Sequence, residues 1–443
     1  MLEILSNRTY RHLFFAQVIA LLGTGLATVA LGLLAYDLAG SNAGAVLGTA
    51  LAIKMVAYIG VAPIAAAFAE RVPRRAMLVT LDLVRAGVAL LLPFVTEIWQ
   101  VYTLIFVLQS ASAGFTPAFQ ATIPDVLSKE ADYTKALSLS RLAYDMESLV
   151  SPALAAALLT VVSFHNLFLG TVVGFLASAV LVVSAVLPKA KKPQPRGIYD
   201  RTTRGMRIYL ATPRLRGLLA FNLAVASASA MVIVNTVVLV QGQLKLTQND
   251  TAMALAAFGA GSMLVALLLP KLLDKLPERH VMLAGAALLV VGLFVGPLMA
   301  SRYLTLLALW FCLGLGYSLV QTPSGRLVRR SSREEDRPAL FAAQFALSHA
   351  CWLITYPLAG WLGAKAGLGV SFIALATVAC AATLASARLW SVADHSEIEH
   401  EHDDLDSAHP HVQQHASASG THHSHELFID SEHPRWPERM RGK

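Results

Sequence analysis

Apolar side chains recur along this chain in runs of about twenty residues, separated by short polar connections. A helix that crosses the hydrocarbon core of a bilayer needs about 20 mostly apolar residues. We therefore predict an all-α membrane protein with twelve transmembrane helices. The predicted helices cover residues 12–36, 43–68, 76–96, 100–122, 136–161, 166–187, 215–240, 251–273, 281–300, 303–321, 339–363 and 368–390.

The composition agrees with this pattern. Hydrophobic residues make up 56% of the chain and charged residues 14%, with a mean hydropathy of +0.57, which excludes a soluble enzyme and a disordered chain. The three cysteines, Cys312, Cys351 and Cys380, lie within apolar runs, so we expect no disulfide framework. We find neither a phosphate-binding G-x-x-x-x-G-K-[ST] loop nor a nucleophile–base constellation. We therefore expect no enzyme activity and no cofactor.

Basic residues mark one side of the predicted membrane. The N-terminus, the connections on its side and the end of the last helix hold 25 Lys and Arg residues, whereas the opposite loops hold only Lys245, Arg302 and Lys365. Loops rich in Lys and Arg stay in the cytosol. We therefore expect both termini in the cytosol. The excess of Lys and Arg over Asp and Glu then reflects the orientation of the helices in a lipid bilayer, and we expect no nucleic-acid partner.

The chain divides into two similar parts. Its longest internal connection, residues 188–213, is rich in Lys, Arg and Pro and has six predicted helices on either side. Glu70–Arg75 after the second helix has a counterpart, Asp274–Arg279, 204 residues later. Such duplication is typical of secondary transporters. The predicted domains are an N-terminal half at 1–187, a cytosolic linker at 188–213, a C-terminal half at 214–392 and a disordered tail at 393–443.

These features resemble the major facilitator superfamily over all twelve predicted helices. Glu70–Arg75 is similar to that family's motif between helices 2 and 3, although Ala66 and Pro73 replace its usual glycines and Glu70 its usual Asp. The resemblance implies a gate in which opposite charges at helix ends lock one conformation. The alternative is that these charges only set the membrane topology, with their long side chains snorkelling toward the water. The implied gating residues are Glu70, Arg71, Arg74, Arg75, Asp274, Lys275 and Arg279.

The last 50 residues have a different composition from the helices. They hold ten of the 14 histidines and eleven acidic residues, but few large apolar residues that could build a core. Histidines at short spacing beside carboxylates indicate metal binding, and the absence of cysteine argues against a Cu(I) site. The alternative is a merely polar, acidic tail. The predicted metal ligands are His395, His400, His402, His409, His411, His415, His422, His423, His425 and His433.

Two further resemblances narrow the expected function. Ser151–Ala156 resembles the small-residue, proline-bearing helix 5 motif of proton-coupled antiporters. A twelve-helix facilitator with a cytosolic His/acid tail is similar to bacterial nickel-resistance exporters of the NreB type. This resemblance implies export of divalent metal cations, Ni²⁺ first and Co²⁺ second, by proton antiport and alternating access. With it we expect a monomer in a bacterial inner (plasma) membrane. The alternatives are a drug or siderophore exporter with an incidental tail and a non-transporting metal receptor.

Charged residues inside the predicted helices are candidates for the transport path, because a charge near the bilayer centre costs at least about 2.5–3.5 kcal/mol. Arg141 and Asp145 can pair at i, i+4, whereas Glu147 points about 200° away from Asp145. When Pro152 is aligned with Pro357, His349 and Cys351 fall in the part of the eleventh predicted helix that corresponds to Tyr144–Met146. The predicted transport and coupling residues are Lys54, Arg141, Asp145, Glu147, His349 and Cys351.

Metal and protons would compete for Asp145, Glu147 and His349 in this prediction. Each residue also has a structural interpretation: a static Arg141–Asp145 pair, a packed histidine, a small buried cysteine, and Lys54 as a counter-ion. Asp82 and Arg85, near the cytosolic end of helix 3, are expected to pair with loop charges there.

Overall fold

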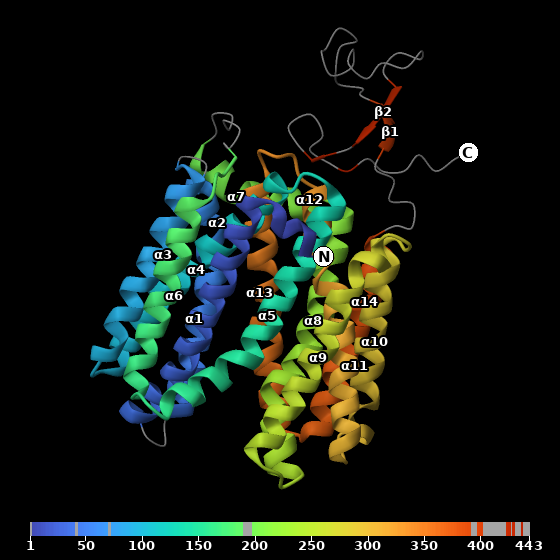
Figure 1. Ribbon diagram of the computed structural model, residues 1–443. Coiled ribbons are helices and arrows are strands. Elements are labelled where there is room, and N and C mark those ends of the chain that lie inside the picture. Colours follow the sequence, from blue (N-terminus) through green and yellow to red (C-terminus); the bar gives the residue numbers. More distant parts are fainter. Residues whose placement is uncertain are drawn as a thin grey trace.

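The apolar runs form long helices that gather into two groups with a central region between them (Figure 1). The computed structural model describes residues 2–39, 43–69, 72–188, 197–390, 397–401, 422–426, 428–429 and 436. The N-terminal half contains the short helix η1 (Leu2–Ser6), α1 (Arg8–Ala39), α2 (Ala43–Ala69), α3 (Arg74–Leu91), η3 (Leu92–Phe94), α4 (Ile98–Val126), α5 (Glu130–Leu159) and α6 (Phe164–Ser184).

The C-terminal part repeats this plan with additions. It contains α7 (Ile198–Ala211), α8 (Pro213–Val237), the π-helical turn η4 (Val238–Gln243), α9 (Gln248–Leu273), α10 (Glu278–Met299), α11 (Tyr303–Gln321), α12 (Ser324–Arg330), α13 (Arg337–Lys365) and α14 (Leu368–Leu389). In the tail, β1 (Glu397–Glu401) and β2 (His422–Glu426) pair as antiparallel strands, where we expected no regular structure. Strand pairing satisfies backbone donors and acceptors that an extended polar segment would otherwise give to water.

The structure confirms the predicted all-helical membrane fold. Eleven helices in the described part of the chain are long and apolar enough to cross a membrane, and each coincides with a predicted one. The remaining predicted helix, 136–161, is the fifth in the chain and corresponds to α5, which is not among the eleven. Six charged residues between Glu130 and Glu147 lower its hydropathy. It still packs in the bundle, against α1 and α9.

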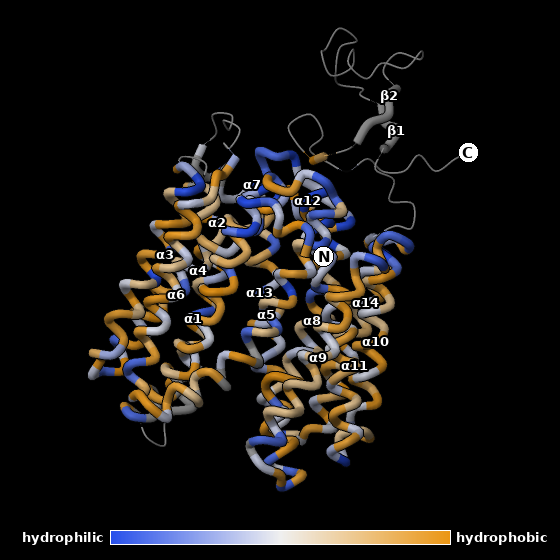
Figure 2. The backbone as a smooth tube through the Cα atoms, viewed as in Figure 1, coloured by the Kyte–Doolittle hydropathy of each residue, from blue (hydrophilic) through white to orange (hydrophobic). Residues whose placement is uncertain are grey.

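The two halves meet through equivalent helices. Within the halves, α1 packs on α6 and α2 on α4, while α8 packs on α14 and α9 on α11. Across the halves, α2 packs on α13 and α5 on α9. Since α2 and α9 are the second helices of their halves, and α5 and α13 the fifth, the two contacts are related by the internal repeat. Figure 2 shows mainly apolar residues along the outer helices and hydrophilic residues at their ends.

The linker contains a helix that the sequence pattern did not predict. Helix α7 lies with α12 at one end of the bundle, which we name the α7–α12 face (Figure 1). A Cβ atom at Gly205 would lie 2.1 Å from the carbonyl oxygen of Ala339, so α7 rests directly on the backbone of α13. Arg204 donates both Nε and Nη2 to the carboxylate of Asp336, at 2.5 and 2.8 Å. The linker is therefore fastened to the start of α13.

Asp82 and Arg85 do not pair with loop charges as expected. They lie well inside α3 and pair with each other, while Asp82 also accepts a hydrogen bond from Ser178 of α6 at 2.8 Å. The guanidinium carbon of Arg85 lies 4.0 Å from the ring centroid of Phe115 and 4.5 Å from that of Phe175. Asp82 is fully buried, so the pair fixes the packing of α3, α4 and α6.

Replacing Asp82 by Ala should destabilise the protein, because Arg85 would keep a buried charge without its carboxylate. The expected cost is about 3–5 kcal/mol, read as a lower midpoint of thermal unfolding in detergent. Asp132→Ala is the matched control: it removes the half-exposed i, i+3 partner of Lys135 at 3.3 Å and should cost less than about 1 kcal/mol. Equal midpoints for the two variants would contradict the structural role of the buried pair.

Candidate central cavity

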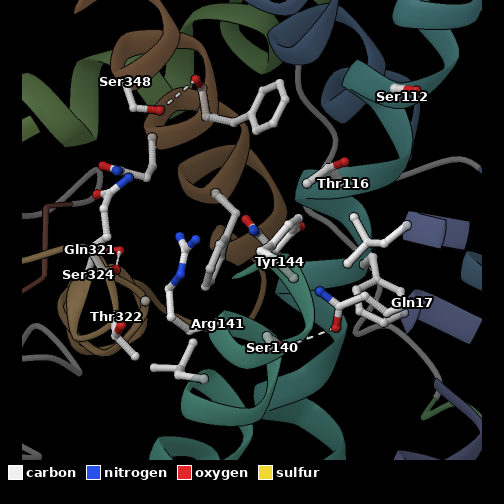
Figure 3. Close-up of a pocket in the computed structure, with 18 of the residues that line it drawn as sticks. Gln17, Ser112, Thr116, Ser140, Arg141, Tyr144, Gln321, Thr322, Ser324 and Ser348 are labelled. Atoms are coloured by element: carbon white, nitrogen blue, oxygen red, sulfur yellow. Dashed lines mark hydrogen bonds between the residues drawn. The ribbon is translucent and has the colours of Figure 1, made fainter. Parts of the chain in front are cut away.

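A cavity of about 460 Å³ lies between the two halves (Figure 3). Its walls come mainly from α1, α2, α4 and α5 of one half and from α11, α12 and α13 of the other. Polar side chains point into it from several helices, and Ser140 of α5 donates to Gln17 of α1 at 3.0 Å. The described lining residues that carry a charge or an imidazole are Lys54, Arg85, Arg141, Glu147 and His349.

The cavity is closed toward the α7–α12 face by contacts between the halves. Tyr133 of α5 donates its hydroxyl to the carbonyl oxygen of Gly325 in α12 at 3.3 Å. Arg329 of α12 donates to the carbonyl oxygen of Ser128, and its guanidinium carbon lies 5.2 Å from the ring centroid of Tyr133. These contacts bring the start of α5 against α12 at the end of the cavity that is nearest the α7–α12 face.

Two charged bridges reinforce this closure. In the Asp125 bridge, Asp125 at the end of α4 pairs with Arg74 of its own half and with Arg337 of the other half. In the Arg326 bridge, Arg326 of α12 pairs with Glu278 of its own half at 2.6 Å and with Glu130 of the other half. The two bridges join equivalent elements of the two halves with the charges reversed.

The predicted gating residues occupy this end of the bundle, apart from Glu70 and Arg71, which lie outside the described residues. Arg74 belongs to the Asp125 bridge. Arg75 donates to the carbonyl oxygen of Ala185 at 2.6 Å, just beyond α6. Arg279, 204 residues later, donates to the carbonyl oxygens of Trp390 and Ala387 at 2.8 and 3.0 Å, at the end of α14. Both arginines thus satisfy carbonyls at a helix C-terminus.

Asp274 and Lys275 follow α9 on the same face, and neither forms an ion pair among the described residues. The repeat therefore preserves the helix-capping arginine more closely than the rest of the motif.

Arg141 and Asp145 form the predicted i, i+4 pair, with Arg141 Nε 2.9 Å from Asp145 Oδ1. Arg141 also donates to the hydroxyl of Tyr317 in α11 at 3.2 Å, and its guanidinium carbon lies 4.8 Å from the centroid of that ring. Asp145 is 3% exposed and is not among the residues lining the cavity. Arg141 therefore faces the cavity and links the halves at mid-height, with Asp145 behind it.

Lys54 and Glu147 both line the cavity, and neither forms an ion pair within the described part of the chain. The ammonium nitrogen of Lys54 lies 5.5 Å from the ring centroid of Tyr58, one turn further along α2. A Cβ atom at Gly25 of α1 would lie 2.1 Å from Ser151 Oγ and 3.1 Å from Glu147 Oε1. The glycine lets α1 approach α5 closely beside the carboxylate. Glu147 is the only acidic residue among the described lining residues.

His349 lies in an aromatic cluster on one wall. Its Nδ1 is 2.7 Å from the carbonyl oxygen of Phe345, and its ring centroid lies 4.7 Å from Tyr58, 4.2 Å from Phe345 and 5.2 Å from Trp352. Cys351, two residues further along α13, donates to the carbonyl oxygen of Leu347 and does not line the cavity. The structure brings Lys54, Arg141, Glu147 and His349 to one cavity and leaves the other two predicted residues behind its walls.

Metal ligation receives no geometric support from these residues. Among the described residues, no group of three or more His, Cys, Asp and Glu side chains is arranged to hold a metal ion. Of the tail histidines, His400, His422, His423 and His425 fall in β1 and β2, where His400 is paired in register with His423. The remaining tail histidines lie outside the described residues, and they are His395, His402, His409, His411, His415 and His433.

Several cavity residues were not singled out from the sequence. Gln17, Tyr58, Tyr144 and Tyr317 supply polar atoms and ring faces from four helices. The sequence carries one indication for Tyr144, which follows Arg141 by three residues and so lies on the same side of α5. Tyrosines are common in apolar helices, however, and only the packing of the two halves shows which of them line the cavity.

Comparison with known proteins indicates the family to which this fold belongs. The family model of the Major Facilitator Superfamily matches residues 13–236 and 218–413. The Bacillus subtilis (strain 168) protein YfiS, described as an uncharacterized MFS-type transporter, is 24% identical over 328 residues, which cover 70% of this chain and 76% of that protein. Macrolide efflux protein A of Streptococcus pyogenes is 26% identical over 153 residues, 32% of this chain and 38% of that protein.

A solved structure shares the architecture. The crystal structure of the human organic anion transporter MFSD10 (TETRAN) superposes with a TM-score of 0.74 at 11% identity, covering 86% of this chain and 99% of that chain. The family match extends over both halves of the bundle and the cavity between them. The chain therefore belongs to the Major Facilitator Superfamily, a family of transporters, and it is a multi-pass membrane transporter.

Proposed function

We propose that this transporter exports an amphipathic organic molecule from the cytosol in exchange for protons. The observation that carries the proposal is the cavity between the halves, with aromatic walls, many hydroxyls and one acidic residue without an ion-pair partner among the described residues. A volume of about 460 Å³ is within the range of sites for drug-sized ligands. The similarity to a macrolide efflux protein over 153 residues favours export.

The lining suggests which chemical groups the substrate carries. Tyr58, Phe345 and Trp352 offer ring faces to an apolar or aromatic body. Glu147 would accept an amine, and Lys54 would attract an acidic or strongly polar group. Arg85 and Arg141 are already neutralised by Asp82 and Asp145, so they add little net charge. The cavity is thus suited to an organic molecule with a cationic group for Glu147 and an acidic or polar group for Lys54, and it contrasts with a compact metal site.

The proposed direction of transport rests on the charge of the loops and on which face of the bundle is closed. Lys and Arg are concentrated at the α7–α12 face, which we assign to the cytosol of a bacterial inner membrane with both termini inside. The Asp125 and Arg326 bridges close this face, so the structure corresponds to a state closed to the cytosol. Breaking both bridges would let the halves rock and expose the cavity to the cytosol.

Glu147 is the proposed coupling residue. A cationic substrate entering from the cytosol would displace its proton, and reprotonation from outside would release the substrate. Competition for one carboxylate links the two fluxes without a further site, and a monomer is sufficient for this mechanism.

Export of Ni²⁺ or Co²⁺ is the second candidate. The tail favours it, with ten histidines and eleven acidic residues in the last 50 residues. The described cavity offers such an ion Glu147 and His349 from opposite halves, but no third ligand of the expected kind. We therefore rank it below an organic substrate.

Glu147→Gln should reduce proton-driven export by about tenfold, a coupling free energy of about 1.4 kcal/mol. Cells of a drug-sensitive bacterium expressing the full chain are first challenged with a macrolide, a cationic dye and an organic anion. Uptake of the exported compound is then followed in inside-out vesicles under an imposed pH gradient. Glu97→Gln, in the capping box of α4 and outside the cavity, should behave as the unmodified protein. Unchanged pH-driven flux in Glu147→Gln would exclude this residue as the coupling site.

Asp125→Asn should open the α7–α12 face, because it removes the partner of both Arg74 and Arg337. A cysteine at Ser140 in a background without native cysteines reports on cavity access. Its reaction with an impermeant maleimide, applied to the cytosolic side of vesicles, should become about tenfold faster, about 1.4 kcal/mol. Asp200→Asn breaks the exposed Asp200–Arg207 pair within α7 and should leave the rate unchanged. A rate that Asp125→Asn does not alter would contradict the gate.

Removal of the tail tests the metal candidate. If a metal is the substrate, cells expressing the full chain should accumulate less Ni or Co than empty cells, measured by elemental analysis. A chain ending at Ala393 should then lose part of that protection, since the tail histidines would deliver the ion. Growth in Zn, Cu and Fe salts serves as the specificity control. Identical metal content in all three strains would rule out Ni and Co as substrates.

A further inference from the structure

Two side chains near the C-terminus pack on the α7–α12 face, although the tail around them is largely polar. Ile429 is 7% exposed and belongs to the apolar core of the C-terminal half. Trp436 packs against the same core. Burial of large apolar side chains at two points fastens the end of the chain to the bundle, since each removes apolar surface from water.

The contact of Trp436 is with a residue that is itself held in place. The guanidinium carbon of Arg214, at the start of α8, lies 5.5 Å from the centroid of the Trp436 ring. Arg214 is 3% exposed. It donates Nε to Ser331 Oγ at 2.7 Å and Nη2 to the carbonyl oxygen of Arg330 at 2.8 Å. A cation–π contact gains strength when the cation is desolvated in this way.

These partners lead directly to the gate. Arg330 donates to Glu278 at 2.9 Å, and Glu278 is the same-half member of the Arg326 bridge. Arg326 in turn pairs with Glu130 of the N-terminal half. Trp436 therefore contacts the residue that fixes the end of α12, and α12 carries the bridge that joins the halves.

We propose that Ile429 and Trp436 form a C-terminal anchor that stabilises the closed α7–α12 face and so regulates transport. The inference rests on the proposed function in that closure of this face is one of the two alternating states. The anchor contacts Arg214, whose guanidinium binds Arg330 and Ser331 at the junction of α8 with α12. A segment that binds this junction in one state and less well in the other shifts the population toward the first. The tail thereby acts as an internal ligand of the gate.

The distance between two spin labels at this face measures its closure. Lys129 and Leu276 are exposed positions in the turns after α4 and α9, one in each half. They are changed to Cys in a full chain whose three native cysteines are replaced by Ala. Distances are measured by double electron–electron resonance in nanodiscs. The closed state gives the short distance and the open state the long one.

Release of the anchor should raise the ratio of the open population, with the long distance, to the closed population, with the short distance, by about three- to tenfold. Trp436→Ala and a chain ending at Leu427, which keeps most of the histidine-rich stretch, should both have this effect. Trp436→Phe retains a ring over Arg214 and should resemble the unmodified chain. Ile429→Ser tests the apolar contact separately. Thermal unfolding of each variant confirms that it is folded.

An unchanged ratio in both Trp436→Ala and the shortened chain would overturn the anchor. Asp125→Asn in the same assay separates this result from a failure of the proposed function, because it breaks a bridge directly. If Asp125→Asn raises the ratio and the anchor variants do not, the gate stands and the anchor is wrong. If none of them changes the ratio, both the gate and the anchor are wrong.

Discussion

The arrangement of the two halves depends on charged residues that each have partners in both halves. Asp125 and Arg326 hold a neighbour within their own half and another across the interface. Each shared charge therefore takes part both in the packing of its own half and in the closure of the interface. Together they close the cavity toward the α7–α12 face, and Arg326 holds α12 against the start of α5.

Charges within the helices divide into two kinds. Asp82–Arg85 and Arg141–Asp145 are paired at short range, and their carboxylates are buried behind helix surfaces. Such pairs hold helices in register and need no water. Lys54 and Glu147 instead face the cavity. An ionised group at that depth is tolerated where water or a ligand solvates it, which is why these two carry the proposed chemistry.

The sequence predicted the helices well because hydropathy over about twenty residues has few alternatives in a membrane protein. It also predicted the Arg141–Asp145 pair, since spacing on one helix is local information. It missed α7, an amphipathic helix of 14 residues whose three arginines and one aspartate interrupt its apolar positions, so that it forms no run of about twenty apolar residues. It did not distinguish which side of α13 faces the cavity, so His349 and Cys351 were taken together although they lie on different sides. Rotation of a helix about its axis is set by its neighbours.

The reversed charges of the two bridges have a consequence for assembly. If two N-terminal halves associated about the same pseudo-twofold axis, Asp125 of one copy would meet Glu130 of the other. Two C-terminal halves would bring Arg326 against Arg337. Each like-charged encounter costs several kcal/mol, whereas the native pairing is attractive at both positions. Although the halves share one architecture, each is thus the electrostatic complement of the other, and during synthesis the first half to emerge is protected against pairing with its own kind.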